Sequence, residues 1–112
     1  MSDHFNKLTP AQDERLALLM EELAEAIHVI GKIMRHGYDS FDPTKKDSPE
    51  NRQLLLQELG DIEAAKDMMI SAGDLVDGIC RLEPGDCTLA IERAKVRKPH
   101  AVTKYLHHQR KP

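Results

Sequence analysis

The sequence has 112 residues, of which 40% are hydrophobic, and a formal net charge of −3 at pH 7. A chain of this length is expected to form a single domain, residues 1–112, that buries roughly two-thirds of its unfolded surface. The weak negative charge and the 4% content of aromatic residues argue against duplex DNA, an anionic membrane or stacked single-stranded bases as partners.

The sequence also predicts the compartment of the protein. No apolar run approaches the roughly 20 residues that a membrane-spanning helix needs, and the N-terminal segment MSDHFNKLTP lacks the basic-then-apolar order of a signal peptide. Cys80 and Cys87 have neither a CxxC spacing nor a histidine pattern around them, which indicates reduced thiols. We therefore expect a cytoplasmic protein that does not enter a membrane.

The first predicted helix begins at Pro10, with Thr9 as its N-cap, and ends before Gly37, a residue typical of helix C-termini. It would contain about 27 residues and extend about 40 Å. A second apolar stripe lies about 100° around this helix from the first. The first stripe is formed by Leu16, Leu19, Leu23, Ile27, Ile30 and Met34, and the second by Leu18, Ala26, Val29 and Ile33.

A loop and a second long helix follow. The segment YDSFDPTKK, from Tyr38 to Lys46, has turn-forming residues and no periodicity, which predicts a loop. Ser48 and Pro49 repeat the cap-then-proline signal, and the next helix is predicted to continue for about 22 residues to Ser71. A connection of about a dozen residues allows the two helices to form an antiparallel hairpin.

The remaining chain predicts shorter elements. Asp74 would cap a short helix that ends near Leu82, and the EPGD segment would form a turn. A last helix is expected from Thr88 to about Lys98, where Pro99 should break or kink it before the segment AVTKYLHHQ resumes as helix. Residues 1–8 and 109–112 are expected to be flexible ends.

These elements predict an all-α fold in which the antiparallel hairpin is completed to a four-helix-type bundle. Both long helices are apolar over a wide arc, and a hairpin of two helices cannot cover all of that surface. The shorter helices and a second subunit should cover the rest, so we expect a homodimer or a homotetramer.

Carboxylates interrupt the apolar surface of both long helices. Glu22 falls inside the second apolar stripe, with Glu25 three residues later, and Glu58 and Asp61 have the same spacing on the second helix. In an antiparallel hairpin the two pairs can face each other, where they must protonate, meet basic groups or hold a cation. Carboxylates without histidine or cysteine suit Mg²⁺ or Mn²⁺. The alternative is solvated helix surface with i,i+4 ion pairs.

These motifs resemble those of a known enzyme family. EELAE (21–25) and ELGD (58–61) are similar to the E-E-x-x-E and E-x-x-D motifs of the MazG-like all-α nucleoside triphosphate pyrophosphohydrolases. The resemblance covers roughly residues 15–108 and includes the segments KIMRHGYDSFDP, NRQLLLQELGD and KYLHHQ. It implies metal-dependent hydrolysis of a (deoxy)nucleoside triphosphate to the monophosphate and pyrophosphate, in nucleotide-pool house-cleaning. The K-x-x-x-N-x-x-R signature of the dimeric dUTPases is missing.

Carried over by position, the resemblance implies a metal site with four ligands and one auxiliary residue. Glu22, Glu25, Glu58 and Asp61 would be the metal ligands, and Glu21 would orient a ligand or a water molecule. Such a metal neutralises phosphate oxygens and lowers the pKa of a water molecule that attacks phosphorus.

Several side chains are candidates for substrate binding. Lys32 and Arg35 follow the glutamates and can bind outer phosphates, although both also suit the negative end of the helix dipole. Lys95 and Lys98 are further phosphate candidates, with solvated surface as the alternative. Tyr38 can stack on a base or anchor the loop.

Two other functions stay open. A non-catalytic helical interaction module, or a nucleotide sensor, would use the same fold without hydrolysis. A nucleic-acid-binding regulator would use the basic C-terminal third, although the acidic charge of the whole chain disfavours it.

Overall fold

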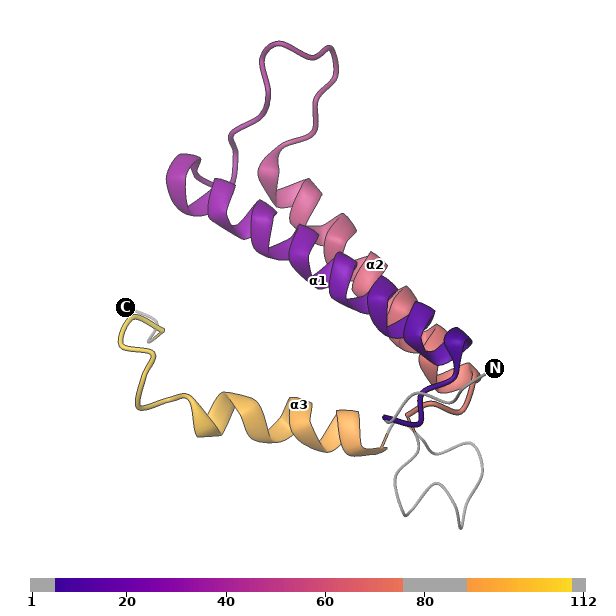
Figure 1. The fold of residues 1–112 in the computed structure, drawn as a ribbon. Coiled ribbons are helices and arrows are strands. Elements are labelled where there is room, and N and C mark those ends of the chain that lie inside the picture. Colours follow the sequence, from indigo (N-terminus) through magenta and orange to yellow (C-terminus); the bar gives the residue numbers. More distant parts are fainter. Residues whose placement is uncertain (1–5, 76–88, 110–112) are drawn as a thin grey trace. The chain divides into compact units, whose positions relative to one another are not determined.

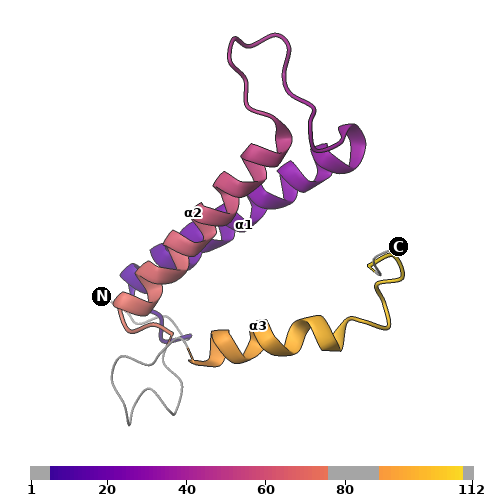
Figure 2. The ribbon, with the colours of Figure 1, turned by 180° about the vertical axis from the view of Figure 1, so that it is seen from behind.

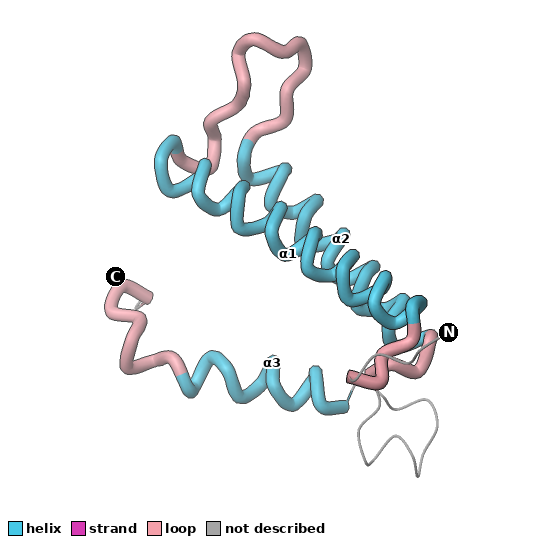
Figure 3. Tube along the Cα trace, viewed as in Figure 1, coloured by secondary structure: helices cyan, strands magenta, loops and turns pink. Residues whose placement is uncertain are grey.

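The computed structural model describes residues 6–75 and 89–109, which contain three α-helices and no strand (Figure 3). Helix α1 spans Pro10–His36, α2 spans Asn51–Ser71 and α3 spans Leu89–Ala101. The prediction of an all-α chain is therefore confirmed for the described residues. The two cysteines, the EPGD turn and nearly all of the predicted helix 74–82 lie outside them.

The chain divides into two compact units, Met1–Asp74 and Leu75–Pro112. The first unit contains α1 and α2, and the second contains α3. None of the helices in the described part of the chain is both long enough and apolar enough to cross a lipid bilayer.

Helix α1 begins and ends at the predicted residues because both of its caps form. The Thr9 hydroxyl accepts a hydrogen bond from the Gln12 amide (3.1 Å), and the Gln12 side chain accepts one from the Thr9 amide (2.9 Å). This is a capping box, with Pro10 at the first helical position. At the other end Gly37 has a φ of +89°, which an L side chain rarely adopts, and its amide donates to the Ile33 carbonyl.

Helix α2 begins two residues later than the cap-and-proline signal predicted. Glu50 is the N-cap and forms a capping box with Gln53, while the Ser48 hydroxyl accepts a hydrogen bond from the Asp42 amide inside the loop. The helix ends at Ser71, as expected, and Gly73 follows with a φ of +81°.

Helices α1 and α2 form the predicted antiparallel hairpin and lie side by side in both views (Figures 1 and 2). Asn51, at the start of α2, bonds to the Gly37 carbonyl after the end of α1. The Arg15 side chain, in the first turns of α1, forms a double hydrogen bond with Asp74 beyond the end of α2. These two links fix both ends of the hairpin.

The hairpin packs through the second of the two predicted apolar stripes of α1. Ala26 and Val29 of that stripe are buried, and they pack against α2, whose own buried apolar residues are Ala65 and Met69. The first stripe stays largely outside this interface. Its exposed members, between 38% and 83% accessible, are Leu16, Leu23, Ile27, Ile30 and Met34, joined by Met20.

The loop between α1 and α2 is braced at its base. The amides of Asn51 and Arg52 donate to the carbonyls of Ser40 (2.8 Å) and Tyr38 (2.9 Å), and Asn51 itself is buried. Farther along, the Asp42 carboxylate accepts a hydrogen bond from the Thr44 amide (2.9 Å). The backbone of this loop is therefore held by its own polar groups.

Helix α3 contains Pro99 inside its last turn, so the proline does not end the helix at Lys98 as predicted. The helix ends at Ala101, and turns follow it instead of a resumed helix. Pro99 lacks an amide hydrogen, so the carbonyl four residues earlier loses its helical partner. The Thr103 hydroxyl donates to the His100 carbonyl (2.9 Å), and such side-chain bonds compete with continuation of a helix.

Candidate metal site

Three of the four predicted metal ligands come together in the middle of the hairpin. Glu22 of α1 and Glu58 and Asp61 of α2 each offer a carboxylate oxygen, and these three atoms lie within 4.8 Å of one another. Ligands on opposite sides of a Mg²⁺ ion stand about 4.2 Å apart, since each Mg–O bond is about 2.1 Å long. The three oxygens are thus close to the spacing that one hard cation requires. We refer to Glu22, Glu58 and Asp61 as the carboxylate cluster.

The cluster is built where the two helices touch. Glu22 is four residues from Leu18 and from Ala26, so it belongs to the stripe of α1 that packs on α2. Glu58 is seven residues from Asn51 and from Ala65, both buried, and therefore lies on the inner face of α2. Both glutamates are half-buried as a result.

Burial leaves part of each glutamate without a partner. The Oε2 atoms of Glu22 and Glu58 are shielded from solvent, and neither has a hydrogen-bond partner within the described residues. No lysine, arginine or histidine in that part of the chain forms an ion pair with any member of the cluster. Buried carboxylate oxygens are normally paired, so the cluster has an unmet need for positive charge or protons.

Burial and neighbouring carboxylates raise the pKa values of the two half-buried glutamates. Desolvation raises the pKa of Glu22 above its ordinary value, and the neighbouring charges of Glu25 and Asp61 raise it further. Desolvation is also the main reason that the pKa of Glu58 is raised, followed by hydrogen bonding to Glu25 and by the charges around it. Each carboxylate is thus easier to protonate in the folded chain than in the unfolded chain.

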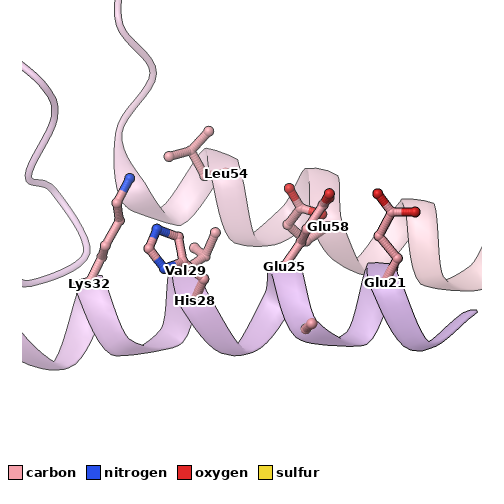
Figure 4. A pocket seen from close by; sticks show the side chains of 8 residues that line it. Glu21, Glu25, His28, Val29, Lys32, Leu54 and Glu58 are labelled. Atoms are coloured by element: carbon pink, nitrogen blue, oxygen red, sulfur yellow. The ribbon is translucent and has the colours of Figure 1, made fainter. Parts of the chain in front are cut away.

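Glu25, the fourth predicted ligand, is not one of the three grouped oxygens but is close enough to hydrogen-bond Glu22 and Glu58. It lies exposed beside the carboxylate cluster, on the wall of an open groove of about 420 Å³ between α1 and α2. Figure 4 shows Glu25 and Glu58 extending from facing helices on this groove. Glu21, the predicted auxiliary residue, lines the same groove one turn away from Glu25. We refer to this hollow as the acidic groove.

The residues of the cluster fit a hard divalent cation. The donor set contains only carboxylate oxygens, which Mg²⁺ and Mn²⁺ prefer, and the open groove leaves room for water ligands. The two orphaned oxygens are the strongest point of this fit, because a cation would satisfy them.

The predicted substrate-binding residues differ in where they lie. Lys32 lines the acidic groove (Figure 4). The Arg35 side chain instead lies along α1 near Gly31, and the Tyr38 ring is covered by the Arg52 guanidinium, 5.0 Å from the ring centroid.

Lys95 and Lys98 belong to the other compact unit and are exposed on α3. Lys95 forms an ion pair with Glu92 (3.3 Å), which agrees with the alternative of solvated helix surface for this lysine.

Sequence reasoning missed a second hollow in the first unit. Lys45 and Lys46 of the loop line it together with Lys32, in a space of about 350 Å³. The lysines stand in the predicted loop segment YDSFDPTKK, and the pair of adjacent cations was the only local signal that could have pointed to them. His28 also lines the acidic groove.

Comparisons of the chain with protein-family models, with curated protein sequences and with solved structures give no match.

Proposed function

We propose that this protein is a Mg²⁺-dependent nucleoside triphosphate pyrophosphohydrolase of the MazG-like type. The observation that carries the proposal is the carboxylate cluster, in which Glu22, Glu58 and Asp61 meet from two helices with unpartnered buried oxygens. If these carboxylates were ordinary solvated helix surface, their oxygens would contact water or the side chain of a lysine or arginine. The matched motifs of the two helices point to phosphate chemistry as the purpose of the cation.

The residues of the groove have distinct roles in this proposal. Glu22, Glu58 and Asp61 hold the cation, and Glu25 adds negative charge beside it without joining the cluster. When bound, Mg²⁺ supplies the charge that neutralises phosphate oxygens and activates water for attack on phosphorus. Lys32, on the same groove, offers an ammonium group to the phosphates. No side-chain nucleophile is needed.

Self-association is part of the proposal. The exposed apolar stripe of α1, Leu16 to Met34, has members three or four residues apart and forms a continuous seam along the helix. A second copy of the chain that covers this seam would complete a four-helix-type bundle, as a homodimer or a homotetramer.

The same seam favours the second candidate function, a helical interaction module without catalysis. An exposed apolar surface of this length is typical of a docking face for another protein. In that case the carboxylate cluster would be a structural irregularity, and Mg²⁺ would have little effect on the folded chain.

Hydrolysis is tested with purified protein, Mg²⁺ and a panel of canonical and modified nucleoside triphosphates. Anion-exchange chromatography should detect the monophosphate and pyrophosphate in equal amounts. Glu22→Gln and Glu58→Gln each remove a cation ligand, and each should lower turnover by more than about 100-fold, since even outer-shell changes at metal sites cost 10–100-fold.

Glu63→Gln is the matched control for these variants. Glu63 is also on α2 but lies outside the cluster, where it pairs with Lys66 (3.6 Å). It should retain full turnover. Orthophosphate as the only product, or no turnover of any nucleotide, would reject the proposed reaction.

A further inference from the structure

The acidic groove and the loop hollow are neighbours that share part of their walls. Lys32 of α1 and Leu54 of α2 line both spaces. The first space is lined by the carboxylates Glu21, Glu25 and Glu58. The second is lined by the loop lysines Lys45 and Lys46 and also by Asp42 and Asp47. We refer to the second space as the loop pocket. A ligand that extends along the hairpin can therefore pass from a groove with three glutamates to a pocket in which three lysines outnumber two aspartates.

The carboxylates of the loop pocket do not fully pair with its lysine side chains. Asp42 is engaged inside the loop by Thr44, and its contact with the Lys45 ammonium is long (4.0 Å) and exposed. Hydrogen bonding from Thr44 is the main cause that lowers the pKa of Asp42, and the charges of Lys45 and Lys32 add to it. Lys46 forms no ion pair with any residue that the structure describes.

The lysines, and not the N-terminus of α2, are the groups available to an anion. Asn51, the first residue of α2, lines the pocket, but its amide donates to the Ser40 carbonyl. The next amide, of Arg52, donates to Tyr38, and the Leu54 amide donates to Glu50. The helix end is thus satisfied by its own chain, and the charge of the pocket comes from side chains.

The order of groups along the hairpin suits a polyphosphate. Glu25 and Lys32 are seven residues apart on one face of α1, which places them about 10 Å apart along the helix axis. Cleavage between the first and second phosphates of a nucleotide leaves pyrophosphate as the departing group. That group carries most of the negative charge and would lie on the side of the cation that faces Lys32.

We propose that Lys45 and Lys46, together with Lys32, form an anion subsite that binds the pyrophosphate end of the substrate. The identity of the ligand, pyrophosphate, rests on the proposed function. The cation itself is held by the carboxylate cluster and not by the lysines. The two loop lysines act as binding residues, so they affect the affinity for pyrophosphate and the KM for the nucleotide. They leave the cleavage step itself to the cluster.

Binding of inorganic pyrophosphate, measured by calorimetry in EDTA, tests the subsite without hydrolysis. The double variant K45Q/K46Q should bind pyrophosphate about tenfold more weakly than the parent, from the loss of two exposed charge contacts. K45R/K46R, which keeps both charges, should bind within a factor of about two of the parent.

K7Q/K66Q is the control with the same change of charge. Lys7 precedes α1 and Lys66 is near the end of α2, so both lie at the end of the hairpin opposite the loop. Equal weakening by K7Q/K66Q and K45Q/K46Q would show a general charge effect and overturn the subsite. Absence of pyrophosphate binding by the parent would overturn it as well.

Steady-state kinetics separates this inference from the proposed function. If the parent hydrolyses a nucleotide and K45Q/K46Q has an unchanged KM, the subsite is wrong and the enzyme stands. If the parent hydrolyses no nucleotide but K45Q/K46Q binds pyrophosphate more weakly than the parent, the subsite stands and the proposed reaction is wrong. A raised KM with a nearly constant kcat supports both.

Discussion

Glu58 shows how burial changes the behaviour of a single carboxylate. Its place between Asn51 and Ala65 on the inner face of α2 desolvates the side chain, and Glu25 lies close enough to share a hydrogen bond. Both effects raise the pKa of Glu58. A group whose pKa is higher in the folded state stabilises the fold below its unfolded pKa, and this contribution is lost as pH rises through the folded pKa. At a pH above the folded pKa, Glu58 therefore no longer contributes this stability.

The raised pKa of Glu58 predicts how Glu58→Gln changes the stability of the metal-free protein. Glutamine keeps the shape but removes the charge, so the variant should melt at a higher temperature than the parent at pH 7 in EDTA. The difference should shrink as pH falls through the raised pKa, because the parent then protonates. Excess Mg²⁺ should raise the melting temperature of the parent more than that of the variant.

Thermal unfolding followed by circular dichroism measures these temperatures. Glu63→Gln, on the exposed side of α2, serves as the control and should change the melting temperature little at any pH. A Glu58→Gln protein that is less stable than its parent in EDTA would contradict the interpretation that desolvation and neighbouring carboxylates raise the pKa of Glu58.

At the scale of the elements, an ion pair closes the hairpin opposite the loop. The Arg15 guanidinium donates two hydrogen bonds to Asp74, at 2.5 and 3.0 Å, and the Asp74 side chain is only 9% exposed. Bonding to Arg15 is the main cause that lowers the pKa of Asp74. These two hydrogen bonds join the first turns of α1 to the chain that leaves α2, so they stabilise the helix pairing itself.

The Asp74 pair predicts a pH dependence opposite to that of Glu58. A carboxylate with a lowered folded pKa stabilises the fold above its unfolded pKa, and the contribution is lost as pH falls through the folded pKa. Asp74→Asn should therefore unfold at a lower urea concentration than the parent at pH 7. The gap should close in strongly acidic solution, where the parent carboxylate is also neutral.

Urea unfolding at a series of pH values gives the comparison for Asp74→Asn. Asp67→Asn is a suitable control, since Asp67 is largely exposed and forms an ion pair with Lys66 (3.5 Å). Equal urea midpoints for parent and Asp74→Asn at pH 7 would show that the bond contributes nothing to the hairpin.

At the scale of the whole molecule, the exposed seam of α1 is the main unsatisfied feature. Ile27 and Met34 are 69% and 83% exposed although both belong to a regular apolar stripe. Few apolar side chains of the hairpin are fully buried, so α1 and α2 alone have a small core. A marginal core and a free apolar seam together favour association.

A charge placed in the seam tests this association. Ile27→Glu would bury an unpaired carboxylate at a self-association interface, so it should weaken assembly by more than about 100-fold. Analytical ultracentrifugation should find the parent as a dimer or larger species and the variant as a monomer. Ala17→Glu adds the same charge outside the seam and should leave the assembly intact. A monomeric parent at high protein concentration would refute the proposed oligomer.

Much of the local structure was predictable because its causes lie within a few residues along the chain. Thr9, Pro10 and Gly37 fix the ends of α1 through capping bonds and backbone preference. The predicted boundaries were wrong where two local signals compete. Ser48 and Pro49 were a valid cap signal, but Glu50 formed the capping box, and Pro99 was tolerated inside the last turn of α3.

The site could be predicted only in part. The sequence by itself determined that carboxylates three residues apart recur on two amphipathic helices, because spacing along a helix is a property of the chain. Only the tertiary structure decided that Glu22, Glu58 and Asp61 bring three carboxylate oxygens within 4.8 Å of one another, with Glu25 beside them. It also decided which apolar stripe of α1 packs inside and that two loop lysines share a pocket with Lys32. These outcomes depend on how residues distant in sequence pack, which local periodicity does not specify.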